Sequence, residues 1–444
     1  MARCSRDELV LDVPGADSEP GLRVWLNLRM ERIAVIADDL TGASDTGVQL
    51  ARRGADVRVR LSLSGRGATL PPNIVVLDTD TRAVLAAAAY ETVSEATRTL
   101  RAEGYTRLYK KLDSTLRGNV GAELDAVLDA GGYGAVLVAP AFPNTGRTTV
   151  GGRHLLHGTP VSETHLARDP VFPVRESHIS HLLREQSRRG TGLVELATVR
   201  AGWGVILERV AQLRAASSKL IILDAKTGAD LRAIAQAAVA LRDEVCCAGS
   251  AGLAEALADE WLPAGAEPRV PVRFGGGPVL VVSGSASEVT REQVRVCVAR
   301  PDTTSIMLDP ALGSEEAERC GAEAGEALAC GRDAILSLRV QEPGGVTSGT
   351  DSHRIVDMLG RAAVRAIVTA RPGGLVLTGG DTARAVCQHI GAHSIRLLAE
   401  LEPGVPLGEL DDVEHLPVVT KAGAFGTPNT LSRALQALRG GGDG

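Results

Sequence analysis

The chain has 444 residues, with 48 basic and 54 acidic side chains and a formal net charge of −6 at pH 7. This charge argues against a general polyanion binder, and the aromatic residues, 2% of the chain, are too few to suggest a platform for stacked bases. The 44% of hydrophobic and 23% of charged residues are typical of a globular protein, and the length predicts two or three domains. We therefore expect no nucleic-acid partner.

The cysteines and the first thirty residues favour a cytoplasmic protein. The seven cysteines show no paired C-x-x-C spacing that would form a zinc site, and a reducing compartment suits them best. No run approaches the roughly 18 apolar residues of a membrane span, so we expect no membrane partner. Residues 1–29 contain prolines, glycines and acids without sustained periodicity, and Met30 directly precedes the first predicted strand. We predict that residues 1–29 are a disordered extension.

From residue 31 onward, short β-branched runs alternate with longer alanine-rich amphipathic segments. This alternation predicts a parallel α/β sheet. The strands of a first domain, residues 30–262, are expected at 32–37, 57–63, 74–78, 107–111, 135–139, 193–197 and 219–224. Its helices are expected at 44–53, 84–103, 120–130, 177–188, 205–214 and 229–240.

A proline- and glycine-rich segment, residues 263–277, is predicted to be a linker. A second α/β domain, residues 278–444, follows it. Its strands are expected at 279–283, 304–308, 334–338, 375–378, 395–400 and 417–420. The predicted fold is therefore two α/β domains with mainly parallel sheets and a ligand cleft between them.

Ligands of open parallel sheets bind beyond the carboxyl ends of the strands. After the first strand come two adjacent acids, Asp38 and Asp39, and the hydroxyl of Thr41. Helix capping explains one such residue, but adjacent carboxylates repel each other unless a cation, a donor-rich ligand or Mg²⁺ is close. We therefore expect at least one of the two acids to contact substrate hydroxyls or a metal ion.

The third and fourth strands deliver more charged side chains to the same edge: Arg82, Lys111, Asp113, Ser114 and Arg117. Arginine binds a carboxylate or phosphate through paired donors, and an aspartate can accept a hydroxyl proton. For any single residue the alternative is a solvated surface charge or, for Asp113, a helix cap. The cluster as a whole favours a binding site.

An irregular segment at 140–154 carries two more arginines, Arg147 and Arg153, and either covers the site or is a structural lid. Its neighbouring histidines, His154, His157 and His165, have no spacing that specifies a metal site, and we expect them at the surface.

Small and glycine residues follow three strands of the second domain, at 283–287, 378–382 and 420–426. Glycine lets backbone N–H groups approach phosphates, and helix N-termini favour anions. Each motif alone is equally compatible with a tight turn, and none matches the P-loop or dinucleotide pattern. Together they predict a nucleotide phosphate site of another type.

Several of these motifs, in this order, resemble the four-carbon acid sugar kinase family. They are residues 36–43, 111–118, 140–147, 249–253, 378–382 and 421–426, and the resemblance extends over about 31–440. It implies a sugar-acid-binding domain, a nucleotide-binding domain, and ATP-dependent phosphorylation of the terminal hydroxyl of a tetronate or 3-oxo-tetronate. The alternatives are a non-catalytic sugar-acid sensor, or an aldolase- or isomerase-type enzyme acting on phosphorylated sugar acids.

The resemblance also implies residue roles. The sugar acid would be held by Asp38, Asp39, Arg82, Lys111, Asp113, Ser114 and Arg117, with the arginines and the lysine on its carboxylate and the acids on its hydroxyls. ATP would be held by Ser283, Gly379, Gly380, Asp381, Thr382, Lys421, Gly423 and Gly426. Mg²⁺ and a cation near the γ-phosphate, Lys421 or Arg117, would neutralise charge, with metal ligands unassigned. Asp113 is the first choice for the catalytic base and Asp39 the second, and a homo-oligomer is compatible with the sequence.

Overall fold

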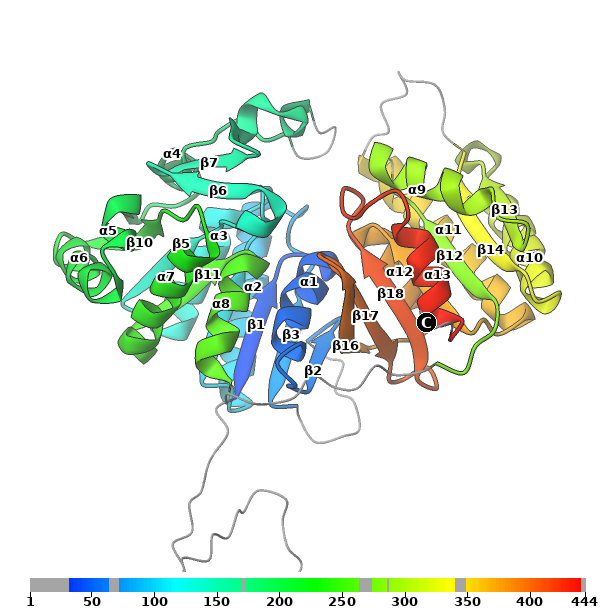
Figure 1. Ribbon diagram of the computed structural model, residues 1–444, viewed down its shortest axis with the longest axis horizontal. Helices are drawn as coiled ribbons and strands as arrows, with labels where there is room; N and C mark the ends of the chain where they lie inside the picture. Colours follow the sequence, from blue (N-terminus) through cyan, green and yellow to red (C-terminus); the bar gives the residue numbers. More distant parts are fainter. Residues whose placement is uncertain are drawn as a thin grey trace, which may run out of the picture.

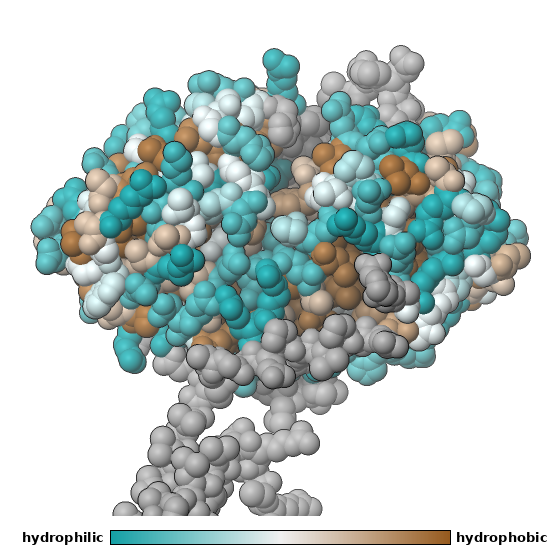
Figure 2. Space-filling model, in the orientation of Figure 1, coloured by the Kyte–Doolittle hydropathy of each residue, from teal (hydrophilic) through white to brown (hydrophobic). Residues whose placement is uncertain are grey.

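The computed structural model describes residues 32–63, 72–168, 173–262, 274–285, 287–339 and 349–440. The extension predicted at 1–29 and most of the linker predicted at 263–277 lie outside these residues. Within them, no helix is long and apolar enough to cross a membrane. The face shown in Figure 2 is mainly hydrophilic over both α/β units.

The two units share one sheet, and the predicted α/β class with a mainly parallel sheet is confirmed (Figure 1). The first unit contributes the strands β1 (Ile33–Ala37), β2 (Val57–Arg60), β3 (Ile74–Asp78), β4 (Arg107–Lys111), β5 (Ala135–Ala139), β9 (Gly190–Val194), β10 (Ser218–Leu223) and β11 (Val245–Gly249). The second contributes β12 (Val279–Ser283), β13 (Thr303–Leu308), β14 (Asp333–Leu338), β15 (Gly374–Thr378), β16 (Ser394–Glu402), β17 (Val405–Leu410) and β18 (Leu416–Lys421). Their order is β13-β14-β12-β15-β18-β17-β16-β2-β3-β1-β4-β11-β5-β10-β9.

The junction between the units is antiparallel. Strand β2 is parallel to β3 of its own unit but antiparallel to β16 of the other, with Arg60 opposite Ser394. Strand β17 is also antiparallel to both of its neighbours, β16 and β18, whereas β18 is parallel to β15. The sequence predicted parallel strands and did not foresee that this junction makes the two sheets continuous.

Helices cover both faces of the sheet. In the first unit they are α1 (Leu40–Ala51), α2 (Ala86–Ala102), α3 (Val120–Gly131), α4 (Ile179–Gln186), α5 (Leu196–Arg200), α6 (Trp203–Ala215), α7 (Gly228–Leu241) and α8 (Ala251–Trp261). In the second they are α9 (Glu288–Val298), α10 (Ser314–Ala329), α11 (Gly349–Thr369), α12 (Gly380–His389) and α13 (Thr430–Leu438). Alternate residues of β1 belong to two different core clusters, Val35 to one and Ile36 to the other. Burial on both faces explains why these strands read as continuous apolar runs.

A small antiparallel sheet stands at the carboxyl edge of the large one (Figure 1). Its strands are β6 (Arg147–Val150), β7 (Arg153–Leu156) and β8 (Thr159–Pro160). The carboxylate of Asp224, directly after β10, accepts the N–H groups of Gly151 and Gly152 at 2.7 and 2.9 Å. The segment expected to be irregular is therefore largely an ordered hairpin, fixed to the strand ends.

Two element predictions need correction. The strand predicted at 193–197 ends at Val194, and α5 begins at Leu196, whose N–H is accepted by Asp224 at 3.1 Å. That hydrogen bond satisfies a helix N-terminal donor where a strand would have continued. Strand β11 and helix α8 of the first unit and strand β17 of the second were not among the predicted elements. The sequence of β11, VCCAG, contains a single β-branched residue, so its strand propensity is weak.

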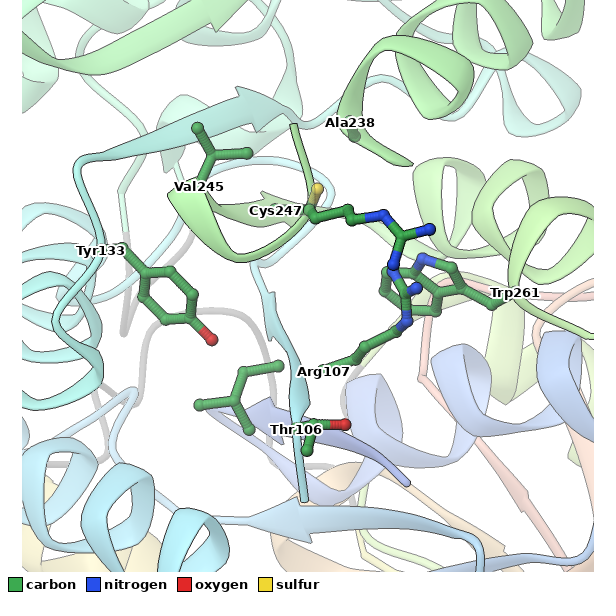
Figure 3. A pocket seen from close by; sticks show the side chains of 9 residues that line it. Thr106, Arg107, Tyr133, Ala238, Val245, Cys247 and Trp261 are labelled. Carbon is green, nitrogen blue, oxygen red and sulfur yellow. The ribbon is translucent and has the colours of Figure 1, made fainter. Parts of the chain in front are cut away.

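A cavity of about 20 Å³ lies at the amino ends of β4 and β11 (Figure 3). This is the edge opposite to the strand ends that carry the predicted site. Its lining residues are Thr106, Arg107, Leu108, Tyr133, Ala238, Arg242, Val245, Cys247 and Trp261.

Candidate active site

Arg82 joins the two adjacent acids that follow β1. Its Nε donates to Asp38 Oδ2 at 2.7 Å, and its Nη1 and Nη2 donate to the two carboxylate oxygens of Asp39 at 2.8 and 2.7 Å. Burial alone would raise the pKa of Asp38, but Arg82 and two nearby lysines lower it below its ordinary value. Arg82 is therefore the cation that offsets the repulsion between these neighbouring carboxylates.

Asp39 also begins helix α1. Its Oδ1 accepts the N–H of Gly42 at 2.9 Å, which is an N-cap hydrogen bond. The capping interpretation is therefore confirmed for Asp39, alongside its pairing with Arg82.

Asp113 has a similar set of partners. Its carboxylate accepts Arg117 Nε and Nη2, both at 2.9 Å, and Thr115 Oγ1 at 2.5 Å, and Arg82 Nη2 lies 3.5 Å away. Burial would raise its pKa, but Arg117 and Arg82 hold the pKa of Asp113 well below its usual range. A carboxylate stabilised in this way is a weak proton acceptor, which argues against Asp113 as the base.

Two other cations are available at this edge. Lys111 is 3% exposed, and its Nζ lies close to Gly42, since a Cβ added to that glycine would be 2.3 Å from it. Arg147 lies over the Phe425 ring of the second unit, 5.2 Å from the centroid, and its buried Nε has no hydrogen-bond partner. Within the described chain neither cation forms an ion pair. Both are therefore positioned to receive an anionic group.

The neighbouring Lys110 has a structural role. It is fully buried, its Nζ lies 2.8 Å from Glu123 Oε2, and it donates to the carbonyls of Ile36 and Lys111 at 3.2 and 2.8 Å. Lys110 is therefore a buried structural residue and not a solvated surface charge.

His154 is buried, so the prediction that it lies at the surface is wrong. Its Nε2–H donates to the carbonyl of Ser114 at 2.8 Å, and its Nδ1 accepts the Thr149 hydroxyl at 3.1 Å. Burial lowers the pKa of His154 to about 4, so the ring is neutral at pH 7. The hairpin folds back onto the loop after β4, and His154 fixes the backbone there. His157 is exposed as expected, and the side chain of His165 lies outside the described residues.

The three glycine-rich loops of the second unit converge at the ends of β12, β15 and β18. A Cβ added to Gly284 would lie 2.0 Å from Thr382 Oγ1, and one added to Gly423 would lie 2.0 Å from Ser285 Oγ. Gly379 adopts φ +96°, and its N–H donates to the Lys421 carbonyl at 2.9 Å. Because no side chain of the described residues caps α12, its first N–H groups are open to a ligand.

The remaining predicted nucleotide-site residues belong to the same loops. Ser283 is buried and its Oγ accepts Thr378 Oγ1 at 3.1 Å, while Asp381 is exposed on the first turn of α12. Gly380 begins α12, and Gly426 has φ +88° in the loop after β18.

Lys421 is buried at the end of β18, where the glycine-rich loop 421–426 begins. It is 1% exposed, and its Nζ donates to Thr290 Oγ1 at 3.1 Å and to the Gly423 carbonyl at 3.4 Å. Burial lowers the pKa of Lys421 to about 8. Gln293 donates to the carbonyls of Phe425 and Thr427 at 3.1 and 2.9 Å. Helix α9 thus holds the loop in shape through Thr290 and Gln293.

The two sets of loops meet directly. A Cβ added to Gly380, the first residue of α12, would lie 3.0 Å from Thr41 Oγ1 and 3.2 Å from Asp39 Oδ2. Nearby, Arg384 of α12 pairs with the buried Asp78 at the end of β3, and its Nε lies 3.0 Å from Asp80 Oδ2. The acid-rich and glycine-rich loops therefore face one another across the unit boundary.

Asp45 was missed by the sequence reasoning. It lies on α1, one turn after Thr41, and its Oδ1 has no hydrogen-bond partner among the residues that the structure describes, although Asp45 is only 7% exposed. Burial raises the pKa of Asp45 to about 7. The sequence feature that could have identified Asp45 is its spacing of four residues from Thr41, which places the two residues on the same face of a helix. Arg147 was part of a recognised motif but not of the predicted site.

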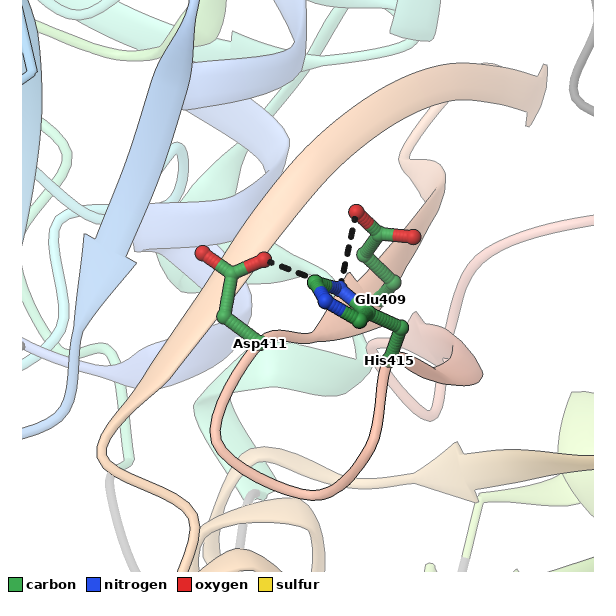
Figure 4. A group of neighbouring side chains, drawn as sticks. All are labelled: Glu409, Asp411 and His415. Atoms are coloured by element: carbon green, nitrogen blue, oxygen red, sulfur yellow. Dashed lines mark ion pairs between the residues drawn. The ribbon is translucent and has the colours of Figure 1, made fainter. Parts of the chain in front are cut away.

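Two further features of the described residues could hold a ligand. A cavity of about 330 Å³ borders Arg82 and Arg117, but Lys111 and Arg147 are not in its lining. The potential metal ligands Glu409, Asp411 and His415 form a group at the turn between β17 and β18 (Figure 4). Arg396 pairs with Glu409 at 3.1 Å and Arg58 with Asp411 at 3.2 Å, so an arginine already neutralises each acid.

Comparison with known proteins agrees with this geometry. Residues 33–257 match a family model described as a sugar-binding N-terminal domain, and residues 280–431 match a nucleotide-binding C-terminal domain. A D-threonate kinase of Bordetella bronchiseptica is 37% identical, covering 92% of this chain and 97% of its own. A D-erythronate kinase of Heliobacterium modesticaldum is 33% identical with the same coverage.

A solved structure from Salmonella typhimurium, provisionally named as a tRNA synthase, has the same fold. Its TM-score is 0.79 at 25% identity, covering 91% of this chain and 99% of its own. The family expected from the sequence motifs, and with it an enzyme that transfers phosphate to an alcohol group, is confirmed. The chain belongs to the four-carbon acid sugar kinase family.

Proposed function

We propose that the protein transfers the γ-phosphate of ATP to the terminal hydroxyl of a four-carbon sugar acid, a tetronate or 3-oxo-tetronate. The observation that carries this proposal is the contact of Gly380 with Asp39 and Thr41. This contact brings a loop that is suited to binding phosphate next to a cluster that is suited to binding a hydroxylated acid. The kinase names of the relatives support the same class of reaction.

The sugar acid would bind among the polar side chains of the first unit. Lys111 and Arg147, which form no ion pair within the described chain, would take the carboxylate. The paired residues Asp38, Asp39, Arg82, Asp113 and Arg117, together with Ser114, would form hydrogen bonds with the hydroxyl groups. This differs from the expectation that Arg82 and Arg117 clamp the carboxylate, because internal acids already pair with both arginines.

ATP would bind along the glycine-rich loops. Gly379, where an added Cβ would have no neighbour closer than 3.5 Å, and the uncapped start of α12 at Gly380 suit phosphate oxygens, and Gly423 lets its loop pack closely against Ser285. Ser283, Thr382 and Gly426 shape these loops, and Lys421 supports them from below. Mg²⁺ neutralises phosphate charge in kinases, and the exposed Asp381 is the carboxylate that we propose to hold it.

We also propose that the protein acts in the cytoplasm. The cysteines of the described residues are all unpaired thiols, which fits a reducing compartment.

The test is ADP release with a panel of D- and L-threonate, D- and L-erythronate and their 3-oxo derivatives. The neutral tetritols threitol and erythritol are the matched controls. We expect ADP release with at least one acid and none above background with the tetritols. Binding of an acid without ADP release would indicate the sensor, and turnover without ATP would indicate the aldolase or isomerase alternative.

A further inference from the structure

The acids nearest the predicted substrate are already engaged. Asp38 and Asp39 are bound to Arg82, and Asp113 is bound to Arg117 and Thr115. A general base must be ionised and free to take a proton at the operating pH. Guanidinium groups occupy both oxygens of Asp39, both oxygens of Asp113 and Oδ2 of Asp38. Asp38 Oδ1 is buried without a hydrogen-bond partner among the described residues, but Arg82 and two lysines lower the pKa of Asp38, so its carboxylate is a weak proton acceptor.

Asp45 lies on the face of α1 that meets the second unit. Thr41, Asp45 and Gln49 recur at a spacing of four residues and therefore share one face of the helix. Thr41 lies against Gly380, and Gln49 Nε2 donates to Glu400 Oε1 of β16 at 3.0 Å. Asp45 is thus located between the start of the nucleotide-binding helix and strand β16.

The charged groups around Asp45 come from four elements. Lys111 of β4 and Arg147 of β6 favour its ionised form, whereas Glu400 of β16 and Asp39 before α1 disfavour it. Burial outweighs the cations and places the pKa of Asp45 at about 7, with Oδ1 unpartnered. This carboxylate interacts electrostatically with both cations that are available to the substrate carboxylate, yet within the described chain it forms no ion pair with an arginine.

We propose that Asp45 is the general base that takes the proton from the terminal hydroxyl of the sugar acid. This inference rests on the proposed function. The hydroxyl oxygen forms a bond to the γ-phosphorus while the bond from that phosphorus to the β,γ-bridging oxygen breaks, and its electron pair leaves with ADP. The proton passes to the Asp45 carboxylate and from there to solvent.

The first test is the kinetics of Asp45→Asn, which keeps the shape and removes the basicity. We expect kcat to fall by about 10² to 10⁴, with calorimetric affinities for ATP and for the sugar acid within about threefold of wild type. The acid limb of the wild-type kcat profile near pH 7 should disappear. Asp45→Glu should recover part of the rate.

Asp78→Asn is the matched control. Asp78 is also buried with a pKa raised to about 7, but it pairs with Arg384 at the unit boundary. We expect this variant to keep the acid limb at the same pH as wild type.

A second measurement does not depend on turnover. Because the pKa of Asp45 is raised from 3.8 to about 7, its ionised carboxylate destabilises the folded protein above about pH 7. This destabilisation decreases as the pH falls from 7 toward 3.8. Asp45→Asn should therefore raise the melting temperature, relative to wild type, more at pH 8 than at pH 5.

The outcomes separate the two proposals. Wild-type enzyme that turns over no four-carbon acid contradicts the proposed function itself. An active wild type with Asp45→Asn within about threefold in kcat overturns the base assignment alone. The assignment also fails if excess Mg²⁺ restores the variant, which would make Asp45 a metal ligand, or if the stability difference does not depend on pH.

Discussion

Gly380 and Asp39 come from opposite halves of the chain and are in contact: a Cβ on Gly380 would lie 3.2 Å from Asp39 Oδ2. Asp39 caps α1, two residues after the end of β1 in the first unit, and Gly380 begins α12 after β15 of the second. The same added atom would lie 3.0 Å from Thr41 Oγ1. The proposed ATP site and the proposed sugar-acid site therefore meet at Gly380. A residue larger than glycine at this position would displace Asp39 and Thr41.

Gly380→Ala tests this contact. The methyl group would push Asp39 and Thr41 away by a few tenths of an ångström, so we expect kcat to fall by about tenfold or more through misalignment. Gly204→Ala on α6 is the control, because an added Cβ there has no neighbour within 4 Å. It should leave kcat unchanged and stabilise the fold by about 0.5 to 1 kcal/mol. Equal kinetics for the two variants would show that the contact is unimportant.

Two variants with opposite expected effects test whether the first unit binds the sugar acid and the second unit binds ATP. Gly423→Val places side-chain atoms where Ser285 Oγ lies 2.0 Å from the Cβ position, so ATP affinity should fall while sugar-acid affinity stays near wild type. Lys111→Met should do the reverse, weakening the acid by about tenfold or more. Calorimetric titration of each variant with each ligand decides the matter. Loss of both ligands in a variant that melts like wild type would contradict the assignment.

Arg384 should be important for joining the units. Arg384→Ala leaves the fully buried Asp78 carboxylate without its partner, which we expect to cost about 3 to 5 kcal/mol in the free energy of unfolding. Because burial raises the pKa of Asp78 to about 7, the loss should be larger at pH 8 than at pH 6, where the acid is mostly protonated. Urea unfolding measures it. Arg295→Ala, which breaks the exposed pair with Glu292, is the control and should have no effect.

His154 should make stability depend on pH in the acid range. Its pKa is lowered from 6.5 to about 4, so its neutral form stabilises the fold fully above pH 6.5, and this contribution is lost as the pH falls toward 4. The loss is up to about 1.4 kcal/mol per pH unit. His154→Leu should remove this dependence and, by leaving Ser114 and Thr149 unpaired, cost about 1 to 3 kcal/mol at pH 7. A variant of the exposed His393 should keep the wild-type dependence in urea unfolding at pH 7 and 5.

Deleting residues 1–29 should leave the melting temperature and turnover nearly unchanged. The segment has no periodic apolar face with which to pack. A loss of several degrees in a thermal melt would show that it packs after all, with the apolar residues at 24–28 as the expected contacts.

The sequence predicted the strand ends well because they follow from simple periodicity. Buried runs such as β1 and β15 end at polar or glycine residues, and parallel connections bring those ends to one edge. It could not show which charges neutralise one another. Arg82 looked like a substrate clamp until its distances to Asp38 and Asp39 were known. Asp45 stayed hidden for the converse reason, because a single acid in an amphipathic helix reads as a solvated residue until its burial is measured.

The ³¹P NMR spectrum of the reaction product tests the central claim most directly. With D-threonate and ATP, we predict a phosphomonoester signal coupled to the two protons of the terminal carbon, appearing together with ADP and depending on Mg²⁺. A phosphomonoester coupled to a single proton would place the phosphate on an internal hydroxyl and contradict the proposed alignment. ADP accompanied only by inorganic phosphate, with every four-carbon acid tried, would contradict the assignment of a sugar acid as the acceptor.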